Sequence, residues 1–522
     1  MNERLPHDFW LKVRDQIRNI AIEYDQIWRK RARLIDSELL FLFIFKLVLS
    51  KNKQGYGSVL IELWDNSADR NLKLPKDDPI AASSICKAMQ KFPEEACARL
   101  NKQILAEWEQ NCRCVELWYG HRVFAVDGSK SNLPRDLIKF GYKTPGDHSY
   151  YPQGLISCLY DLKKAIPYDF DLVSHMNERD CSINHLSVLK AGDVVVFDRG
   201  YFSYLLVKAA FDRGIFAVFR LQSNFSNTEI KAFWKSDQTD KIVRVNPPKD
   251  LLKKSKMSPS NNKNKPINVR LIKYTISGET YVLATLLIDK CYPASIFPDL
   301  YHSRWGIEEL YKISKCLIEV EDYHGQSERR VKQELFAHFV LVSLARIFEC
   351  QAEDLLPENL TGTFKNESQT GNRLKSAINQ PEDRQYRSPG EPEKLSFGTK
   401  TKSPDGHQCK SHTNTAKAKL SEPEIPTISK EKEKKDGLKT QVKLNFKNCL
   451  LVLQRTMEYL FLLNSLDFVN IRVPRVLNSI VRLRQKVRPD RHYPRISRKP
   501  LKRRRNTGEK EGQLRAAIAA PG

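Results

Sequence analysis

The fold is decided by the stretch Val194-Val195-Val196-Phe197-Asp198-Arg199-Gly200, in which an aspartate follows a short apolar run. A second stretch of this kind, Val123-Phe124-Ala125-Val126-Asp127-Gly128, lies upstream. Short apolar runs rich in β-branched residues predict buried strands. An apolar helical pattern at residues 204–211 and another apolar run at 215–221 follow the first stretch. Strand, helix and strand in this order predict a parallel pair in an α/β sheet.

The two aspartates are candidate functional groups. In open α/β sheets such groups gather at the carboxyl ends of strands, and a glycine soon after each aspartate permits a sharp exit from the strand. If the strands are neighbours, two carboxylates about 4 Å apart repel by roughly 4 kcal/mol at an effective dielectric constant near 20. A bound divalent cation would relieve that repulsion. A single aspartate after a strand is more often a turn former or a helix cap, so the pair alone does not decide the function.

A third element comes from a predicted helix near residues 301–315. At about 100° per residue, four of its side chains fall within about 60° of one another. They are Tyr301, Arg304, Glu308 and Lys315. A solvated helix face with an Arg–Glu pair four residues apart is the alternative interpretation. The combination of residue types fits better a metal-binding acid flanked by groups that bind phosphate.

The spacing Tyr301-x2-Arg304-x3-Glu308-x6-Lys315 resembles the signature of bacterial DDE transposases of the insertion-sequence-four family. The contexts Asp127-Gly128-Ser129 and Asp198-Arg199-Gly200-Tyr201 are also similar to those of this family. The similarity covers about residues 30–350 and resumes weakly near residues 442–466. It implies an α/β fold with a ribonuclease-H-like catalytic core. A β-rich insertion would interrupt that core before the helix that bears the last acid.

The resemblance also implies a two-metal mechanism of DNA cleavage. The metal ligands and catalytic residues would be Asp127, Asp198 and Glu308. They would hold two Mg²⁺ ions about 3.5–4 Å apart, for which Mn²⁺ would substitute. One ion would activate a water or a DNA 3′-hydroxyl, and the other would stabilise the leaving oxygen. DNA phosphates would be contacted by Tyr301, Arg304 and Lys315.

The implied function is that of a transposase, an endonuclease that also transfers the strands of an insertion sequence. Its partners would be the DNA of the element ends and the target DNA, bound by a homodimer. A catalytically inactive or hydrolysis-only ribonuclease-H-like DNA-binding protein is the alternative. The terminal repeats, the target sequence and the choice between a hairpin and a direct mechanism are not encoded in any pattern of this chain.

The amino-acid composition of the chain agrees with binding to DNA. The 522 residues include 87 Lys and Arg against 62 Asp and Glu, a net charge of +25, which attracts nucleic acid or an anionic membrane. Membrane is the weaker choice because no apolar run reaches the roughly 20 residues that a span needs. The first residues lack the apolar segment of a signal peptide, and the 11 cysteines contain no C-x2-C pair. We therefore expect a cytoplasmic, nucleoid-associated protein.

The patterns divide the chain into six regions. Residues 353–440 lack apolar periodicity and are rich in Ser, Thr, Lys, Glu and Pro, which predicts disorder. The first region, residues 1–115, is interpreted equally well as a DNA-binding module or as a helical cap on the core. The regions are a helical N-terminal DNA-binding region (1–115), the first part of the core (116–222), a β-rich insertion (223–300), the second part of the core with the glutamate helix (301–352), a disordered polar insertion (353–440), and a C-terminal helix with a basic tail (441–522).

Overall fold

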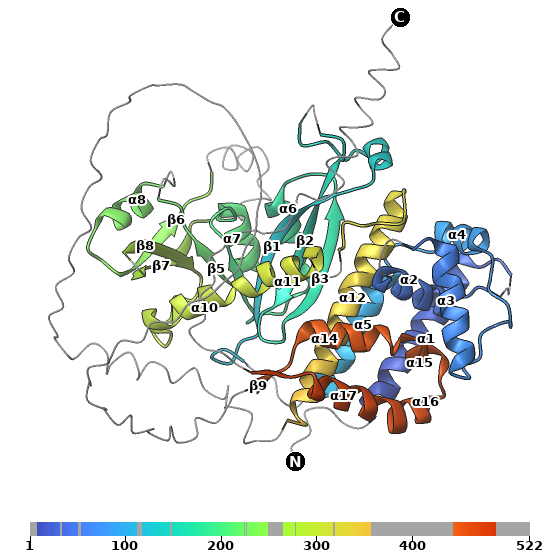
Figure 1. Ribbon diagram of the computed structural model, residues 1–522. Helices are drawn as coiled ribbons and strands as arrows, with labels where there is room; N and C mark the ends of the chain where they lie inside the picture. Colours follow the sequence, from blue (N-terminus) through green and yellow to red (C-terminus); the bar gives the residue numbers. More distant parts are fainter. Residues whose placement is uncertain are drawn as a thin grey trace, which may run out of the picture. The chain divides into compact units, whose positions relative to one another are not determined.

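The computed structural model shows a mixed α/β protein with a sheet and many helices (Figure 1). The residues that it describes are 8–31, 34–50, 54–111, 117–146, 149–223, 225, 227–248, 265–276, 278–316, 319–356 and 442–486. The predicted polar insertion lies outside these residues, apart from residues 353–356. The part of the predicted basic tail beyond residue 486 lies outside them as well.

Helices form the described part of the chain before the sheet. They are α1 (Phe9–Trp28), α2 (Ser37–Leu49), α3 (Tyr56–Asp69), α4 (Ala82–Lys91) and α5 (Ala96–Asn111). Helix α2 begins where the Asp36 carboxylate accepts a hydrogen bond of 2.8 Å from the Leu39 amide, as expected of an N-cap. Nearly all residues of α2 are apolar and it is buried over most of its length, as expected of a helix that is apolar on every side.

The described strands of the main sheet follow the order β3-β2-β1-β4-β5-β8-β7-β6. Strands β1·β4 and β4·β5 are parallel, and the other neighbours are antiparallel. Helix α7 (Tyr204–Asp212) joins β4 to β5, so the predicted strand–helix–strand unit is confirmed. The strands are β1 (Val123–Asn132), β2 (Gln153–Asp161), β3 (Ile166–Val173), β4 (Val194–Phe197), β5 (Phe216–Arg220), β6 (Asp240–Val245), β7 (Ile267–Ile276) and β8 (Glu279–Thr285).

Strands β6, β7 and β8 come from the region predicted to be a β-rich insertion. They do not form a sheet of their own, because β8 pairs with β5 and extends the main sheet. Helix α8 (Thr228–Lys235) precedes them in the chain and packs against β6 and β7. Short 3₁₀ turns occur at Arg135–Phe140, Leu186–Val188 and Ala294–Ile296.

The two faces of the sheet are covered by different helices. Side chains alternate along a strand, and on one face Val126 and Phe197 share an apolar core with α7 and with the turn that follows α6 (Glu178–His185). On the other face Val123 and Val194 pack with Leu300 of α10 (Phe297–Ser303). Helix α11 (Trp305–Cys316) continues from α10 and contacts β1 (Figure 1).

Helix α12 (Glu328–Glu353) lies at the centre of the helical part and packs against α2, α5, β3 and the C-terminal helices. The other C-terminal elements are α14 (Phe446–Gln454), α15 (Met457–Leu462), α16 (Ser465–Asp467), a π-helical turn (Phe468–Arg472), α17 (Val473–Arg482) and the short strands β9 (Val442–Lys443) and β10 (Gln485–Lys486). Among the described helices, α12 alone is long and apolar enough to span a membrane, but 78% of its apolar window is buried inside the protein. Its burial is that of a core helix.

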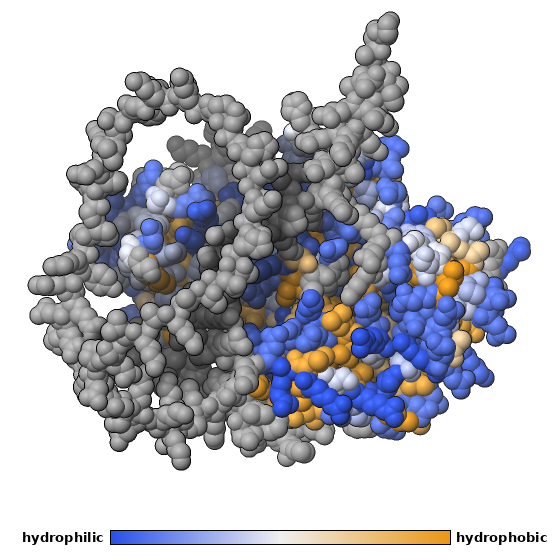
Figure 2. Space-filling model, viewed as in Figure 1, coloured by the Kyte–Doolittle hydropathy of each residue, from blue (hydrophilic) through white to orange (hydrophobic). Residues whose placement is uncertain are grey.

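The arginine-containing segment Val473–Arg482 forms helix α17 and is not part of a basic tail. Residues Val476, Leu477 and Ile480 of α17 are buried in the large apolar core, so this segment is a packed amphipathic helix. The many arginines of the segment obscured the apolar spacing of three and four residues. Figure 2 shows mainly hydrophilic residues on the visible surface of the helical part, with apolar patches between them. Leu466 and Ile471 are exposed apolar residues of these C-terminal elements.

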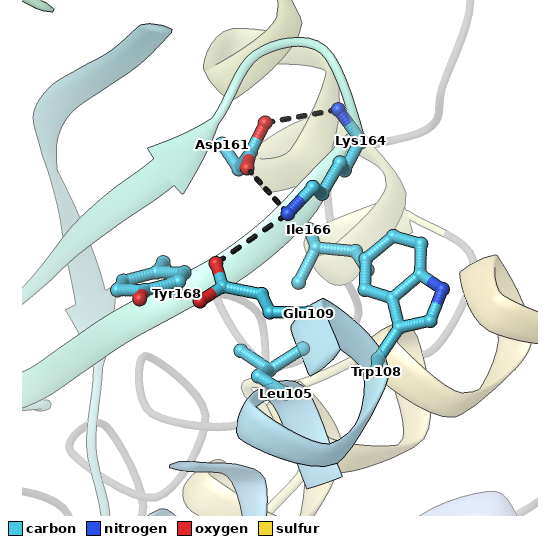
Figure 3. Close-up of a pocket in the computed structure, with 7 residues that line it drawn as sticks. All are labelled: Leu105, Trp108, Glu109, Asp161, Lys164, Ile166 and Tyr168. Atoms are coloured by element: carbon cyan, nitrogen blue, oxygen red, sulfur yellow. Dashed lines mark hydrogen bonds and ion pairs between the residues drawn. The ribbon is translucent and has the colours of Figure 1, made fainter. Parts of the chain in front are cut away.

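Helix α5 is joined to the hairpin of β2 and β3 through one lysine (Figure 3). The Lys164 ammonium lies 3.4 Å from the Glu109 carboxylate of α5 and 3.7 Å from the Asp161 carboxylate of β2. It also lies 5.0 Å from the centre of the Trp108 ring. The small gap that these side chains surround is closed by their contacts and has no room for a ligand. The contact therefore fixes the helix to the sheet.

His338 of α12 predicts how stability depends on pH. Its Nε2 lies 2.8 Å from the Ser314 hydroxyl of α11, and full burial lowers the pKa of His338 from 6.5 to about 3. The folded protein disfavours the charged form of His338. Its contribution to the unfolding free energy is therefore complete above pH 6.5 and is lost as pH falls towards 3. Between pH 7.5 and pH 5 the wild type should therefore lose about 2 kcal/mol more unfolding free energy than His338→Gln. Urea unfolding at both pH values measures this difference; the exposed His302→Gln serves as control, and an equal loss in wild type and His338→Gln would contradict the prediction.

Candidate active site

The register of the sheet places Asp127 beside Asp198. Strands β1 and β4 are parallel neighbours with Val126 opposite Phe197, so the next residue on each strand is an aspartate. By alternation, both carboxylates point to the face that carries α10 and α11. Asp198 directly follows the last residue of β4, as predicted. Asp127 does not end its strand, because β1 continues to Asn132 in register with β2.

Gly128 has a different role from the predicted one. Its backbone stays in the extended strand and has no positive φ, so it makes no sharp exit. A Cβ atom at Gly128 would lie 2.8 Å from Leu155 Cδ1 and 3.0 Å from both Cγ and Oε1 of Glu178. Glycine is therefore required here because the Glu178 side chain of α6 lies directly on the backbone next to Asp127.

Gly128→Ala should disturb the site, because the new methyl group would force Glu178 and Leu155 apart. We expect a loss of about 1–3 kcal/mol in unfolding free energy, the usual cost of an overpacked position. Gly200→Ala is the matched control, since a Cβ there meets nothing within 4 Å and the backbone φ is not positive. Thermal and urea unfolding of the two variants test this difference. Equal stability of both variants would contradict the proposed contact.

The four side chains predicted to share one face of a single helix, at positions 301, 304, 308 and 315, lie on two helices. Helix α10 ends at Ser303 and α11 begins at Trp305, with Arg304 between them. The amides of Arg304 and Ile307 each bond to the carbonyl three residues earlier, which is the tighter 3₁₀ pattern. The Ser303 hydroxyl also bonds to the Leu300 carbonyl, which competes with the regular helix bonds. The chain therefore departs from a regular α-helix at Arg304.

Arg304 lies between the acids. Its guanidinium donates a hydrogen bond of 2.6 Å to Glu308 and lies 3.8 Å from the Asp127 carboxylate. Asp198 accepts a hydrogen bond of 2.8 Å from the Tyr301 hydroxyl, and the Tyr301 ring lies 5.7 Å from the Arg304 guanidinium. The structure thus gathers four of the other five predicted site residues around the buried Arg304.

The surroundings move the pKa values of the two aspartates in opposite directions. Burial raises the pKa of Asp127 to about 6, and the negative charges of Glu178 and Asp198 add to this, against the Gly128 amide and Arg304. Burial also acts to raise the pKa of Asp198, but the Arg199 amide, the Tyr301 hydroxyl and the charge of Arg304 lower it below its ordinary value overall. The hydrogen bonds and charge around Asp198 therefore outweigh its burial, whereas the Gly128 amide and Arg304 offset the burial of Asp127 only in part.

Lys315 lies further along β1 and does not contact the aspartates. Its ammonium donates to the Lys130 carbonyl and lies 3.7 Å from Glu321. Tyr311, to which the sequence gave no role, lies closer: its hydroxyl donates to the Asp127 carbonyl at 2.8 Å and to the Ile156 carbonyl at 3.2 Å. Its place three residues after Glu308 on the same helix was the available signal.

Comparisons with known proteins bear on the segment that contains these residues. Residues 118–344 match the family model of the transposase DDE domain. A curated protein of Sinorhizobium fredii, named "Putative transposase y4zB", is 25% identical over 191 residues, which cover 36% of this chain and 51% of the relative. This chain therefore spans about half the length of the curated relative that it matches.

A solved structure gives a more distant likeness. A chain of the piggyBac transposase synaptic complex with hairpin DNA aligns with a TM-score of 0.35 and 10% sequence identity. The alignment covers 67% of this chain and 75% of that chain.

The carboxylates of Asp127, Asp198 and Glu308 are suitable ligands for a divalent cation, although their present positions do not form a complete binding site. Carboxylate oxygens are the ligands that Mg²⁺ prefers, and Asp127 and Asp198 lie side by side on adjacent parallel strands. Within the described ranges, no three His, Cys, Asp or Glu side chains lie close enough together to hold a metal ion. Glu308 accepts a hydrogen bond from Arg304 in this arrangement, and the buried Arg304 Nε atom has no hydrogen-bond partner among the described residues. Glu308 would have to leave Arg304 in order to bind a cation together with the aspartates.

Proposed function

We propose that this chain is a DDE transposase of the insertion-sequence-four family that cuts DNA and transfers the cut strands. One observation supports this most strongly. Asp127 and Asp198 lie on adjacent parallel strands, and Arg304 links Glu308 to Asp127. All three acids lie inside the segment that matches the transposase DDE domain. The catalytic acids in this proposal are Asp127, Asp198 and Glu308.

The arrangement of the sheet supports a ribonuclease-H-like core. The strand order β3-β2-β1-β4-β5, with antiparallel pairing among the first three and parallel pairing among the last three, is the order expected of that fold. In this proposal the strands β6, β7 and β8 are the β-rich insertion, placed before the helix that carries Glu308. The spacing of Tyr301, Arg304, Glu308 and Lys315 supports the assignment to the insertion-sequence-four family.

The residues of the site have separate roles in this mechanism. Two Mg²⁺ or Mn²⁺ ions bound by the acids would activate the attacking water or 3′-hydroxyl and stabilise the leaving oxygen. Tyr301 holds the Asp198 carboxylate in place by its hydrogen bond. Arg304 exchanges Glu308 for a DNA phosphate, which leaves the glutamate free to join the aspartates and gives the buried guanidinium an anionic partner. Tyr311 holds the backbone of Asp127.

DNA is the partner that the charge of the chain supports. A net charge of +25 favours binding to the phosphate backbone, and each neutralised phosphate steepens the salt dependence by about 0.9 in log–log slope. The ends of the element and the target DNA would be bound by a homodimer. In this proposal Lys315, at the end of α11, contacts the DNA outside the reacting phosphate.

The experiment that tests the function is a cleavage and joining assay. The purified chain is incubated with a plasmid that carries the inverted repeats flanking its reading frame, with Mg²⁺, Mn²⁺ or EDTA. We expect metal-dependent cuts at the repeats and products joined to target DNA, both absent with Asp198→Asn. Cut ends without joined products would indicate a hydrolysis-only nuclease. DNA binding without any cut would indicate an inactive DNA-binding protein.

A further inference from the structure

A surface turn follows the strand that carries Asp127. Strand β1 continues past Asp127 to Asn132, and the chain then forms the 3₁₀ turn Arg135–Phe140 before it returns in β2. At about 3.3 Å per residue, the end of β1 lies roughly 17 Å from Asp127. One hydrogen-bonded strand therefore connects the turn to the candidate active site.

The turn is anchored on the face of the sheet that α11 covers. Leu133, Leu137 and Tyr142 are at most 1% exposed and belong to the apolar core that also contains Leu310 of α11. The Tyr142 hydroxyl donates a hydrogen bond of 2.9 Å to the Glu328 carboxylate at the start of α12 (Figure 1). These contacts fix the backbone of the turn, so its remaining side chains are held at the surface.

The side chains that stay exposed are apolar, aromatic or positively charged. Ile138 and Phe140 are 42% and 50% exposed, although Leu137 beside them is fully buried. Tyr150, which precedes β2, is 41% exposed. The Arg135 guanidinium lies 4.5 Å from the centre of the Tyr150 ring and donates a hydrogen bond of 2.9 Å to the Tyr150 carbonyl. This surface suits a partner that has both apolar and anionic groups.

The charge of the turn indicates an anionic partner. Residues 130–146 contain four Lys and Arg residues against one Asp, a net charge of +3. Lys139 lies 3.2 Å from Asp136, which neutralises one of the cations. Arg135 and Lys143 are exposed, and neither has an acidic partner in the part of the chain that the structure describes. These two cations are therefore available to bind phosphate.

Lys315 lies between the acids and the turn. Helix α11 begins beside Arg304, next to the acids, and its 12 residues span about 18 Å. At its other end the Lys315 ammonium donates to the Lys130 carbonyl of β1. The helix therefore runs along β1 in the direction of the turn. A DNA backbone that contacts both the acids and Lys315 continues over Arg135–Phe140.

From this arrangement we infer that the turn Arg135–Phe140 is a DNA-binding element that holds the duplex on one side of the reacting phosphate. The inference rests on the proposed function and adds to it a surface outside the signature residues. Arg135 and Lys143 bind phosphates, and Ile138 and Phe140 pack against the sugars and base edges of a groove. At about 3.4 Å per base pair, this contact lies roughly five base pairs from the cut.

The test measures DNA binding by the full chain carrying Asp198→Asn, in EDTA, so that no cleavage occurs. The probe is a fluorescently labelled duplex with one inverted repeat from the DNA that flanks the reading frame, and its anisotropy is recorded over a series of salt concentrations. We expect Arg135→Gln and Lys143→Gln each to make the log–log salt dependence less steep by about 0.9. Phe140→Ser should weaken binding about 10-fold without changing that slope, because it removes apolar contact and no charge.

Matched controls are Lys241→Gln and Ile242→Ser, an exposed cation and an exposed apolar residue on β6, at the far edge of the sheet. Both should bind the duplex like the parent Asp198→Asn protein. Thermal unfolding should be unchanged in all variants, since the substituted side chains are exposed. Hydroxyl-radical footprinting should show protection roughly five base pairs from the cut, and only the variants of the turn should lose it.

Turn variants that bind with the affinity and salt slope of the parent protein would show that the turn does not contact DNA, and the proposed function would stand on the cleavage assay. Equal losses in the β6 controls would also overturn the inference, because the effect would not be specific to the turn. If the turn variants keep DNA affinity but lose self-association in analytical ultracentrifugation, the surface contacts a second copy of the chain instead. If the parent protein does not bind the duplex and the wild type does not cut it, the proposed function and this inference both fall.

Discussion

Replacing Asp127 by asparagine should abolish metal-dependent DNA cleavage and stabilise the metal-free protein at the same time. The asparagine keeps the side-chain oxygen that accepts a hydrogen bond of 2.9 Å from the Gly128 amide. It removes the negative charge that the proposed mechanism needs for a cation. We expect cleavage to fall by at least about 100- to 1,000-fold, the range for losing one electrostatic stabiliser of a transition state.

The gain in stability follows from the sign of the pKa shift. The pKa of Asp127 is about 6 in the folded chain against an ordinary value of 3.8, so folding favours its protonated form. The stability contribution of Asp127 is complete below pH 3.8 and is lost as pH rises through 6. Above pH 7 the ionised carboxylate therefore costs about 1–3 kcal/mol, which asparagine avoids.

Three measurements check this prediction. Thermal unfolding at pH 8 in EDTA should show a higher midpoint for Asp127→Asn than for wild type. Mn²⁺ should raise the midpoint of the wild type and leave that of the variant unchanged, since a ligand stabilises only the state that it binds. The exposed Asp212→Asn, which loses a surface pair with Lys208, should change the midpoint little. A variant that still cut DNA would exclude Asp127 as a metal ligand.

The sequence predicted the parts of the fold that depend on local pattern. The apolar runs of β1, β4 and β5 are short and uninterrupted, so they could be placed without tertiary information. Strand β3 was missed because Pro167, Asp169 and Asp171 break its apolar pattern. Strand β3 is defined by its pairing with β2 in a hairpin, and the sequence pattern does not indicate this hairpin.

The sequence predicted the three acids but not their surroundings. Helical spacing placed Arg304 and Glu308 on one side of a helix, and their hydrogen bond agrees with that spacing. The role of Gly128 depends on Glu178, which lies 50 residues later in the printed sequence and reaches the strand only because α6 packs across it. No periodicity within either segment carries that information. A sequence pattern identifies which residues have the right chemistry, whereas the partner of each comes from the packing.

Glu458 is expected to have the largest effect on stability of any residue outside the site. It is fully buried in α15, where its carboxylate lies 2.7 Å from the Lys46 ammonium of α2 and 3.0 Å from the Arg70 guanidinium. Glu458→Gln would leave the buried Lys46 ammonium with only the more distant and partly exposed Glu62 carboxylate as a counter-charge. Breaking a buried ion pair on one side usually costs about 3–5 kcal/mol, and we expect a loss of that size in unfolding free energy.

Glu62 provides a matched control, because it lies 3.6 Å from the same Lys46 ammonium but is 42% exposed at its side chain. Water compensates a charge lost at that position, so Glu62→Gln should cost less than about 1 kcal/mol. Chemical denaturation with urea measures both variants. Equal losses for the two would show that burial does not set the strength of this interaction.

The double variant Lys46→Met with Glu458→Leu separates the cost of an unpaired charge from the value of the pair. If the ion pair contributes little beyond compensating its own desolvation, two apolar side chains of similar volume should restore most of the stability lost in Glu458→Gln. Glu62 and Arg70, which are both partly exposed, would then each lose one ionic partner, at small cost because water reaches them. A double variant as unstable as Glu458→Gln would instead show that the charges themselves hold α15 against α2. In that case the pairing of residues far apart in the chain, and not only apolar packing, joins the C-terminal helices to the N-terminal ones.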